Sequence, residues 1–241
     1  MASISAENVS VSFPIFDHSS RSVRQTAIQL GTGTRKAAPV INALRGITLN
    51  IRDGDRIGLI GHNGSGKSTF LRVLSGVYFP TGGIVDIHGS RSSLLNLHAG
   101  MDYEASGFEN ILLLGVSAGM SRRQVNAQTD DIIAFADLGE AIARPVRTYS
   151  AGMQLRLAFA VATAKAADII LIDEVISVGD VNFHERAKER LRALVGAAAV
   201  LVVASHDNDV LRANCNRGLV FSDGRIVFDG AIEAAISYSA E

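Results

Sequence analysis

Hydrophobic and polar residues alternate near the start of the chain. Over residues 4–13 (ISAENVSVSF) this alternation predicts a strand. In a second strand, over residues 44–51, Ile47, Leu49 and Ile51 fall on one face. Short apolar runs predict buried strands at Arg56 to Ile60, Ile169 to Ile172 and Val200 to Ala204.

Helical patterns fill the regions between these strands. A helix is expected over Gly66 to Val77, and residues 107–166 are mostly helical, with helices that open near Phe108, after Ser121 and at Ser150. Later elements alternate: helices over 181–195 and 207–213, then strands around 218–221 and 225–228 that flank an Asp223-Gly224 turn. This order predicts one α/β domain over residues 1–241, with an inserted helical subdomain over about 100–165.

Residues 17–40 (DHSSRSVRQTAIQLGTGTRKAAPV) lack this periodicity. They are rich in Ser, Thr and Gly, and their charged side chains are basic apart from Asp17. We expect a long loop inserted between the first two strands. Two interpretations of its charge stay open, namely a solvated loop or a segment that reaches the membrane surface or lipid phosphates.

Composition sets the broad class. The chain has 241 residues, 47% of them hydrophobic and 20% charged, which is typical of a globular protein. A formal net charge of −1 argues against a nucleic-acid-binding protein. No uncharged run approaches the roughly 20 residues of a spanning helix, and MASISAENVS does not resemble a secretory signal. With one cysteine, Cys215, the chain suits a reducing compartment, so we expect a cytoplasmic location.

Residues Gly61 to Thr69 read GHNGSGKST and fit the phosphate-loop pattern G-x-x-x-x-G-K-[ST]. The preceding strand and following helix supply the required context. We expect Lys67 to approach the β- and γ-phosphates, Ser68 to ligate Mg²⁺ and Thr69 to hold the α-phosphate. The predicted nucleotide-binding residues of this loop are Gly61, Asn63, Gly64, Ser65, Gly66, Lys67, Ser68 and Thr69.

Acidic residues end the strand IILIDE at 169–174. Asp173 is placed to hold Mg²⁺ through water, and Glu174 to act as general base on the attacking water. Taken alone, these acids could be solvated strand-end residues. With a phosphate loop about a hundred residues earlier, the catalytic interpretation is favoured.

Two further segments indicate nucleotide chemistry only because they occur in a fixed order with the phosphate loop and the acidic strand end. In YSAGM, Ser150 can cap a helix and Gly152 permits close approach of a phosphate. His206 follows an apolar strand within SHD. Each on its own would be read as structural.

Together, GHNGSGKST, YSAGMQLRLAFA, IILIDEVISVGD and SHD resemble the nucleotide-binding subunits of ABC transporters, over about Asn8 to Tyr238. The resemblance implies a P-loop ATPase core with an antiparallel β-subdomain and a helical subdomain, and a head-to-tail homodimer that encloses two ATP molecules. It implies that Ser150 and Gly152 contact the γ-phosphate held by the other subunit. The loop Ser177 to Asp180 would then cross the interface, and His206 would contact the γ-phosphate and orient Glu174.

The sequence departs from the usual family pattern at several positions. Ala151 and Met153 replace a glycine and a glutamine, and Gly179 stands where alanine or leucine is usual. The glutamine of the loop before the helical subdomain is missing, near Leu97 in SSLLNLHAGM. For the aromatic residue that stacks on adenine, the candidate is Phe13, with Phe16 in reserve.

With these variants, the segment IDEVISVGD and the long N-terminal insert, the chain resembles the subfamily that exports lipid-linked polysaccharides such as O-antigen, capsule and teichoic acid. The resemblance implies integral-membrane partner subunits at the cytoplasmic face of the inner membrane, with residues 107–119 receiving the partner's coupling helix. Some members of this subfamily carry a C-terminal carbohydrate-binding domain, and because this chain ends at Glu241, soon after the final strand, we expect that domain to be absent. The alternatives are an ABC ATPase of another transporter class, a soluble ABC ATPase, and a plain P-loop kinase or GTPase, against which YSAGM and SHD argue.

Overall fold

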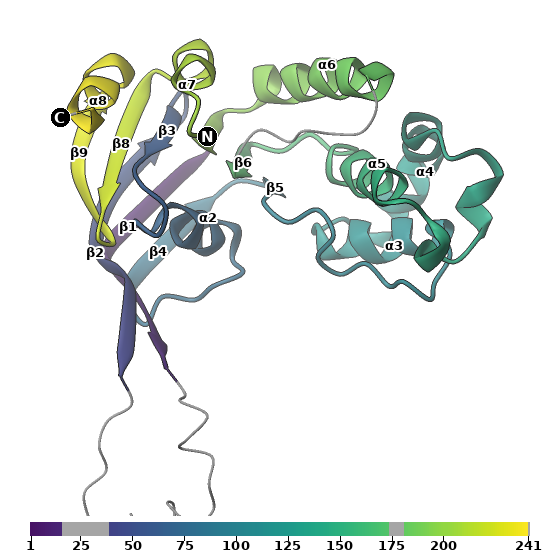
Figure 1. Ribbon diagram of the computed structural model, residues 1–241, viewed down its shortest axis with the longest axis horizontal. Helices are drawn as coiled ribbons and strands as arrows, with labels where there is room; N and C mark the ends of the chain where they lie inside the picture. Colours follow the sequence, from purple (N-terminus) through teal and green to yellow (C-terminus); the bar gives the residue numbers. More distant parts are fainter. Residues whose placement is uncertain (16–38, 174–180, 241) are drawn as a thin grey trace, which may run out of the picture.

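The computed structural model describes residues 1–15, 39–173 and 181–240. Two sheets organise these residues. A six-stranded sheet has the order β5-β6-β7-β3-β8-β9, and a three-stranded sheet has the order β2-β1-β4. Figure 1 shows the two sheets side by side, with a group of helices set apart from them.

The six-stranded sheet is the centre of the core. Its first five strands run parallel, and β9 pairs antiparallel with β8. Their bounds are β5 Arg91–Leu94, β6 Ile169–Asp173, β7 Val200–Ala204, β3 Arg56–Ile60, β8 Arg217–Ser222 and β9 Arg225–Ala231. The apolar runs predicted as buried strands are β3, β6 and β7, which confirms that interpretation. Strands buried on both faces need apolar residues at every position.

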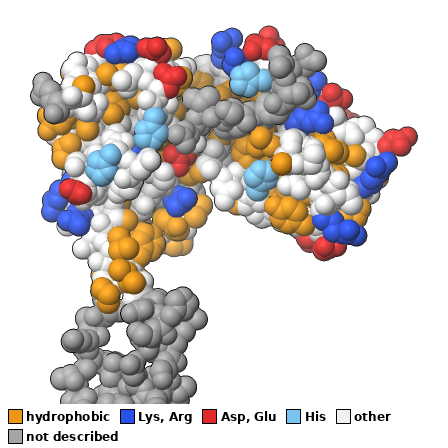
Figure 2. Space-filling model, viewed as in Figure 1, with side chains coloured by type: hydrophobic (Ala, Val, Ile, Leu, Met, Phe, Trp, Pro, Cys, Tyr) orange, Lys and Arg blue, Asp and Glu red, His pale blue; other side chains and the backbone are white. Residues whose placement is uncertain are grey.

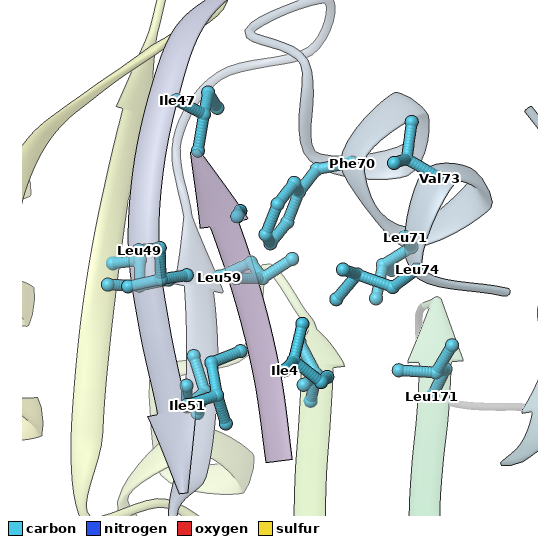
Figure 3. Packing of buried hydrophobic residues seen from close by; sticks show 14 of the residues in the cluster. Ile4, Ile47, Leu49, Ile51, Leu59, Phe70, Leu71, Val73, Leu74 and Leu171 are labelled. Atoms are coloured by element: carbon cyan, nitrogen blue, oxygen red, sulfur yellow. The ribbon is translucent and has the colours of Figure 1, made fainter. Parts of the chain in front are cut away.

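Alternate residues of β6 enter two different hydrophobic clusters. Ile169 and Leu171 join a cluster that contains α2 (Lys67–Ser75) and the three-stranded sheet. In Figure 3, Phe70, Leu71 and Leu74 of α2 point toward these strands. Ile170 and Ile172 face the opposite way, toward α7 (Asn208–Asn214), α8 (Ile232–Ser239) and part of α6 (Val181–Ala197). The two-residue repeat of a strand thus produces a layered α/β core.

The three-stranded sheet is antiparallel. It consists of β1 Ser3–Pro14, β2 Val40–Arg52 and β4 Gly82–His88. β4 pairs with β1 only as far as Ser10, so the ends of β1 and β2 continue as a two-stranded ribbon (Figure 1). The predicted insert over 17–40 begins beyond this ribbon and lies outside the described residues, apart from Pro39 and Val40. Figure 2 shows hydrophobic side chains gathered near the ribbon's end, where Phe13, Ile15, Val40 and Ile41 are exposed.

The helical group has a hydrophobic cluster of its own. It contains α3 Gly107–Ser117, α4 Arg122–Ala136 and α5 Ala151–Ala162, with two 3₁₀ helices, Gly139–Ala143 and Val146–Thr148, between α4 and α5. The predicted starts of all three helices are confirmed, because Ser106, Ser121 and Ser150 cap them. At Ser106 and Ser121 a capping box forms with Glu109 and Gln124.

Neither β5 nor α8 was predicted from the sequence pattern. β5 is short and largely polar, and α8 follows β9 directly. Within the described residues, no helix combines the length and apolar character that a membrane crossing requires.

Candidate nucleotide-binding site

The phosphate loop joins β3 to α2, as its pattern predicts. Gly64 has φ +82° and Gly66 has φ +113°, conformations that favour glycine. A Cβ atom at Gly66 would lie 2.8 Å from the carbonyl oxygen of Ala43, so the loop passes close to β2. The Gly224 N–H donates to the carbonyl of Ser65 at 2.9 Å and ties the loop to the β8–β9 turn. These constraints fix the loop's curvature.

Lys67 begins α2 and is only 8% exposed. Its ammonium donates to the carbonyl oxygens of Gly61 and His62 and so lies over the loop. Ser65 is fully buried, and its hydroxyl oxygen has no hydrogen-bond partner within the described structure. A buried polar group without a partner is costly unless a ligand satisfies it. The Lys67 ammonium is therefore available to an anion above the loop, whereas the Ser65 hydroxyl is an unpaired polar group buried within it.

A cavity of about 530 Å³ opens in front of this loop, within the size range of small-molecule sites. It is bounded by the phosphate loop, by β2, by the ends of β6 and β7, and by the β8–β9 turn. Of the predicted site residues, the cavity is lined by Asn63, Gly64, Gly66, Lys67, Ser68, Thr69, Asp173 and His206. Gly61 and Ser65 belong to the same loop but do not line it. Residues from both ends of the chain are thus brought to one pocket.

Ser68 and Asp173 meet at this cavity from neighbouring elements, α2 and β6. A hydroxyl and a carboxylate are oxygen ligands of the kind that Mg²⁺ prefers. In the described part of the chain, no group of three or more His, Cys, Asp and Glu residues is placed to hold a metal. The pair fits an ion whose other ligands are phosphate oxygens and water, because Mg²⁺ usually takes few protein ligands.

Part of the cavity wall could not be predicted from the sequence. Ile41, Asn42, Ala43 and Arg45 of β2 line it, together with Asp223 and Gly224. The hairpin turn at 223–224 was predicted, but its place beside the phosphate loop depends on the pairing of β8 with β3. No local signal in the sequence gives that long-range pairing.

Phe13, the candidate adenine platform, packs edge-on against Tyr78, with the ring centroids 5.3 Å apart. It is 37% exposed and does not line the cavity. Its cross-strand partner, Ile41, does line it. The structure therefore places Phe13 one strand away from the cavity wall. Phe16, Glu174 and the segment 177–180, which includes Asp180, lie outside the described residues.

The YSAGM segment has a firm local structure. Ser150 caps α5, and its hydroxyl oxygen accepts a hydrogen bond from the Met153 N–H at 3.2 Å. Tyr149 is buried, and its hydroxyl donates to the Ala141 carbonyl at 2.7 Å. This burial raises the pKa of Tyr149, which keeps the hydroxyl protonated as a donor. The start of α5 is thus anchored within the helical group.

Gly152 stands out at this helix start. Its φ is not in the left-handed region, and the nearest atom to an added Cβ would be the Ser150 hydroxyl oxygen at 3.9 Å. Nothing in the described part of the chain therefore requires glycine here. Neither Ser150 nor Gly152 is among the described residues that line the cavity. In Figure 1, α5 and α2 belong to separate groups of elements.

The loop after β5, where the usual glutamine is missing, joins the two groups. Leu97 is partly buried and packs against three hydrophobic clusters. One belongs to the helical group, one to the core, and the third lies where the two parts meet. The Nδ1 atom of the neighbouring His98 is buried without a hydrogen-bond partner, and Asn96 is exposed. Leu95 lines the cavity. An apolar side chain thus occupies the position assigned to the glutamine.

A phosphate loop between a strand and a helix, with an acid at the end of another parallel strand of the same sheet, defines a P-loop nucleotide-binding protein. The family model described as ABC transporter matches residues 44–177. The chain also has the fold of the dimeric post-hydrolysis ATP-binding cassette MJ0796 bound to ADP and Pi, with a TM-score of 0.68, 22% identity, and coverage of 95% of this chain and 98% of that one. A second solved structure, an ATP-binding subunit of an ABC transporter, gives a TM-score of 0.68 at 17% identity, covering 96% and 90% of the two chains.

Sequence relatives agree with this fold. The chain is 38% identical over 234 residues to the O-antigen export system ATP-binding protein RfbE of Yersinia enterocolitica, covering 92% of this chain and 98% of that protein. It is 45% identical over 186 residues to RfbB of Myxococcus xanthus, also named an O-antigen export system ATP-binding protein, covering 77% and 43%. It is 39% identical over 175 residues to the teichoic acids export ATP-binding protein TagH of Lactiplantibacillus plantarum, covering 73% and 48%.

The chain therefore belongs to the ABC transporter family, as the family match and the Yersinia relative show. It is an ATP-binding ATPase subunit of that family, which confirms the resemblance drawn from its motifs. It spans less than half the length of the Myxococcus and Lactiplantibacillus relatives.

Proposed function

We propose that this chain hydrolyses ATP to power the export of a lipid-linked polysaccharide across the inner membrane. It would act at the cytoplasmic face, as a head-to-tail homodimer bound to integral-membrane subunits. The substrate class is supported by the names of the relatives, O-antigen export for two and teichoic acid export for the third. Other classes of ABC transporter remain the alternative for the substrate alone.

One observation supports the proposed dimer. The phosphate cavity contains the loop, Lys67 and Asp173, whereas Ser150 and Gly152 lie outside it among the described residues. Gly152 has no structural reason within the described chain to be glycine. A phosphate that approaches from a second subunit would supply that reason, because a glycine leaves the helix N-terminus open to an anion. Each subunit would then complete the other's site.

Within one site the residues have distinct tasks. Lys67 neutralises phosphate charge, and the N–H groups of the phosphate loop surround the phosphates. We assign Glu174 as the general base for the attacking water and His206, which lines the cavity, as the group that orients it. When Mg²⁺ is bound, Ser68 and Asp173 would hold it, and it would neutralise the charge that develops on the β- and γ-phosphate oxygens.

The opposite subunit adds the remaining contacts. Ser150 and Gly152 would reach the γ-phosphate, with Asp180 in the loop that crosses the interface. Hydrolysis then depends on closure of the dimer, because phosphoryl transfer relies on positioning and charge neutralisation. Loss of the γ-phosphate removes part of the contact and lets the dimer open. This cycle can drive a membrane partner.

The surface for that partner would include α3. Phe108, Leu113 and Val116 of this helix are exposed although its opposite side is buried in the helical cluster. Exposed apolar side chains on one helix suit an amphipathic partner helix. They fall within residues 107–119, the region expected to receive the coupling helix. The described parts of the chain contain no membrane-crossing helix of their own.

Export is tested in cells. A strain that lacks this chain should accumulate lipid-linked polysaccharide on the cytoplasmic side and lose it from the surface. The wild-type chain should restore surface polysaccharide, whereas the matched variant Lys67→Ala should not. Normal surface polysaccharide in the deletion strain would contradict the substrate assignment. The ATPase assignment would be unaffected by that result.

A further inference from the structure

Helix α6 contacts both parts of the molecule. Its first half contributes Phe183 and Ala187 to a cluster with Phe159 of α5 and Phe135 of α4. Its second half contributes Leu191, Leu194 and Val195 to the cluster beneath the six-stranded sheet. One helix therefore spans the boundary between the helical group and the core, as Figure 1 also shows.

Arg190 makes three different contacts across this boundary. Its guanidinium lies over the Phe135 ring, 4.4 Å from the centroid. It donates from Nε to the Thr163 carbonyl at 3.2 Å and from Nη2 to the Asp131 carboxylate at 2.6 Å. The Arg190 side chain is only 17% exposed. A planar guanidinium can stack and bond in two directions at once, which a lysine ammonium cannot do.

Arg186, one helical turn earlier, contacts the same ring. Its guanidinium lies 5.3 Å from the Phe135 centroid, and it donates to the Phe135 carbonyl. It also approaches the Asp137 carboxylate at 3.7 Å. Phe135 in turn stacks on Phe159, with centroids 6.0 Å apart, and meets Phe183 edge-on at 5.3 Å. Rings and guanidinium groups thus enclose Phe135 from several sides.

These contacts grip the C-terminal end of α5. Phe159 lies in its last turn, and Thr163, whose carbonyl accepts from Arg190, is its C-cap. Ser150 caps the other end of the same helix. At 1.5 Å per residue the helix is about 18 Å long, so a tilt of about 5° at the gripped end moves the start by about 1.5 Å. Displacements of this size matter for catalysis, since about 1 Å of misplacement can cost a hundredfold in rate.

We propose that Arg190 and Arg186 are positioning residues for ATP hydrolysis. They fix α5 against α6 so that Ser150 and Gly152 are presented to the nucleotide of the opposite subunit. The inference rests on the proposed shared site and deepens it. The two arginines do not touch the nucleotide cavity, and the phosphate loop is built without them. Their loss should therefore lower turnover while a single subunit still binds ATP.

The test measures kcat, KM and single-subunit ATP affinity for the purified full chain with Arg190→Ala. We expect kcat to fall by about tenfold or more, because the start of α5 is displaced. The affinity of the monomer for ATP should stay within about twofold of wild type, since the cavity is unchanged. The matched control is Lys188→Ala on the same helix, which removes an exposed lysine paired with Glu185 and should leave kcat unchanged.

An unchanged kcat in Arg190→Ala would overturn the proposal. So would a fall in kcat accompanied by an equal loss of monomer ATP affinity, because that pattern indicates a general structural role. If Arg190→Ala does not fold, Arg190→Lys keeps the charge without the planar stacking. It should lower kcat several-fold at unchanged ATP affinity, and a wild-type kcat would overturn the proposal. Wild-type turnover in the Ser150→Arg variant would instead count against the shared site itself.

Discussion

The phosphate loop and the start of α5 use glycine in opposite ways. In the loop, Gly64 and Gly66 have positive φ angles, and a side chain on Gly66 would collide with β2. At the start of α5, Gly152 has neither constraint within the described residues. The first region is shaped by contacts inside its own chain. In the proposed dimer, the contact that requires glycine at position 152 comes from the nucleotide of the opposite subunit.

The two regions also differ in how their polar groups are satisfied. Ser65 in the phosphate loop has a buried hydroxyl oxygen without a partner in the described structure. Ser150 already accepts a hydrogen bond from its own helix. A hydroxyl can accept and donate together, so Ser150 can keep its cap and still donate to a phosphate. The Ser65 hydroxyl is therefore an unpaired group buried inside the loop, whereas the Ser150 hydroxyl is a paired group at an exposed helix start.

The largest effect is expected from Lys67→Ala. The substitution removes the ammonium that lies over the phosphate loop, so ATP affinity and hydrolysis should each fall by about a hundredfold or more. Isothermal titration calorimetry and a steady-state ATPase assay measure the two quantities. Lys188→Ala serves as the control for loss of an exposed lysine. Retained ATP affinity would show that the loop does not use Lys67 for binding.

Ser150→Arg should separate ATP binding from turnover. A bulky cation at the start of α5 should block closure on the opposite subunit, so hydrolysis should fall by about a hundredfold, whereas monomer ATP affinity stays near wild type. Ser121→Arg is the matched control, because Ser121 caps α4 in the same subdomain with similar backbone angles, although it also forms a capping box with Gln124. Both changes cost about 1 kcal/mol of capping energy. Equal activity losses in the two variants would show that the loss of a helix cap, and not a block to dimer closure, causes the fall in hydrolysis.

Gly152→Ala should stabilise the fold and impair the enzyme. Alanine is favoured over glycine in a helix by up to about 1 kcal/mol, and the structure has room for its Cβ. Hydrolysis should still fall by about tenfold, because the methyl group occupies the space of an approaching phosphate. Gly196→Ala in α6 offers the same helix gain with open space around it and should leave activity unchanged. Thermal unfolding and ATPase assays decide between them. Full activity in Gly152→Ala would contradict the proposal that a phosphate bound by a second subunit approaches this glycine.

The smallest effect is expected from Phe13→Ala. If Phe13 takes one side of the base, as the sequence predicts, its loss should weaken ATP binding by about fivefold, near the lower end of base-stacking energies. Its place beside Tyr78 and behind Ile41 keeps the effect small. Phe79→Ala, at a more exposed aromatic residue, is the control. An unchanged ATP affinity would show that Phe13 does not contact the base and that other residues, such as Ile41, do.

Local patterns predicted much of this structure. The phosphate loop, the acid at the end of β6 and the starts of the three helices each depend on a few neighbouring residues, so the sequence predicts them. The wall of the cavity depends on how β2 and the 223–224 turn pack beside the phosphate loop, which is a long-range arrangement. Phe135 and Arg190 come together from two helices, without a shared motif. Contacts of this kind follow from tertiary packing and leave no periodic signal.

The central claim is that each active site takes residues from two subunits. Mixing the Lys67→Ala and Ser150→Arg variants, each inactive alone, tests it most directly. In a mixed dimer one site contains both defects and the other contains neither. An equal mixture should therefore regain ATPase activity, up to about a quarter of wild type when subunits exchange freely. Activity no higher than the average of the two separate variants, with mixed dimers present, would contradict the shared site.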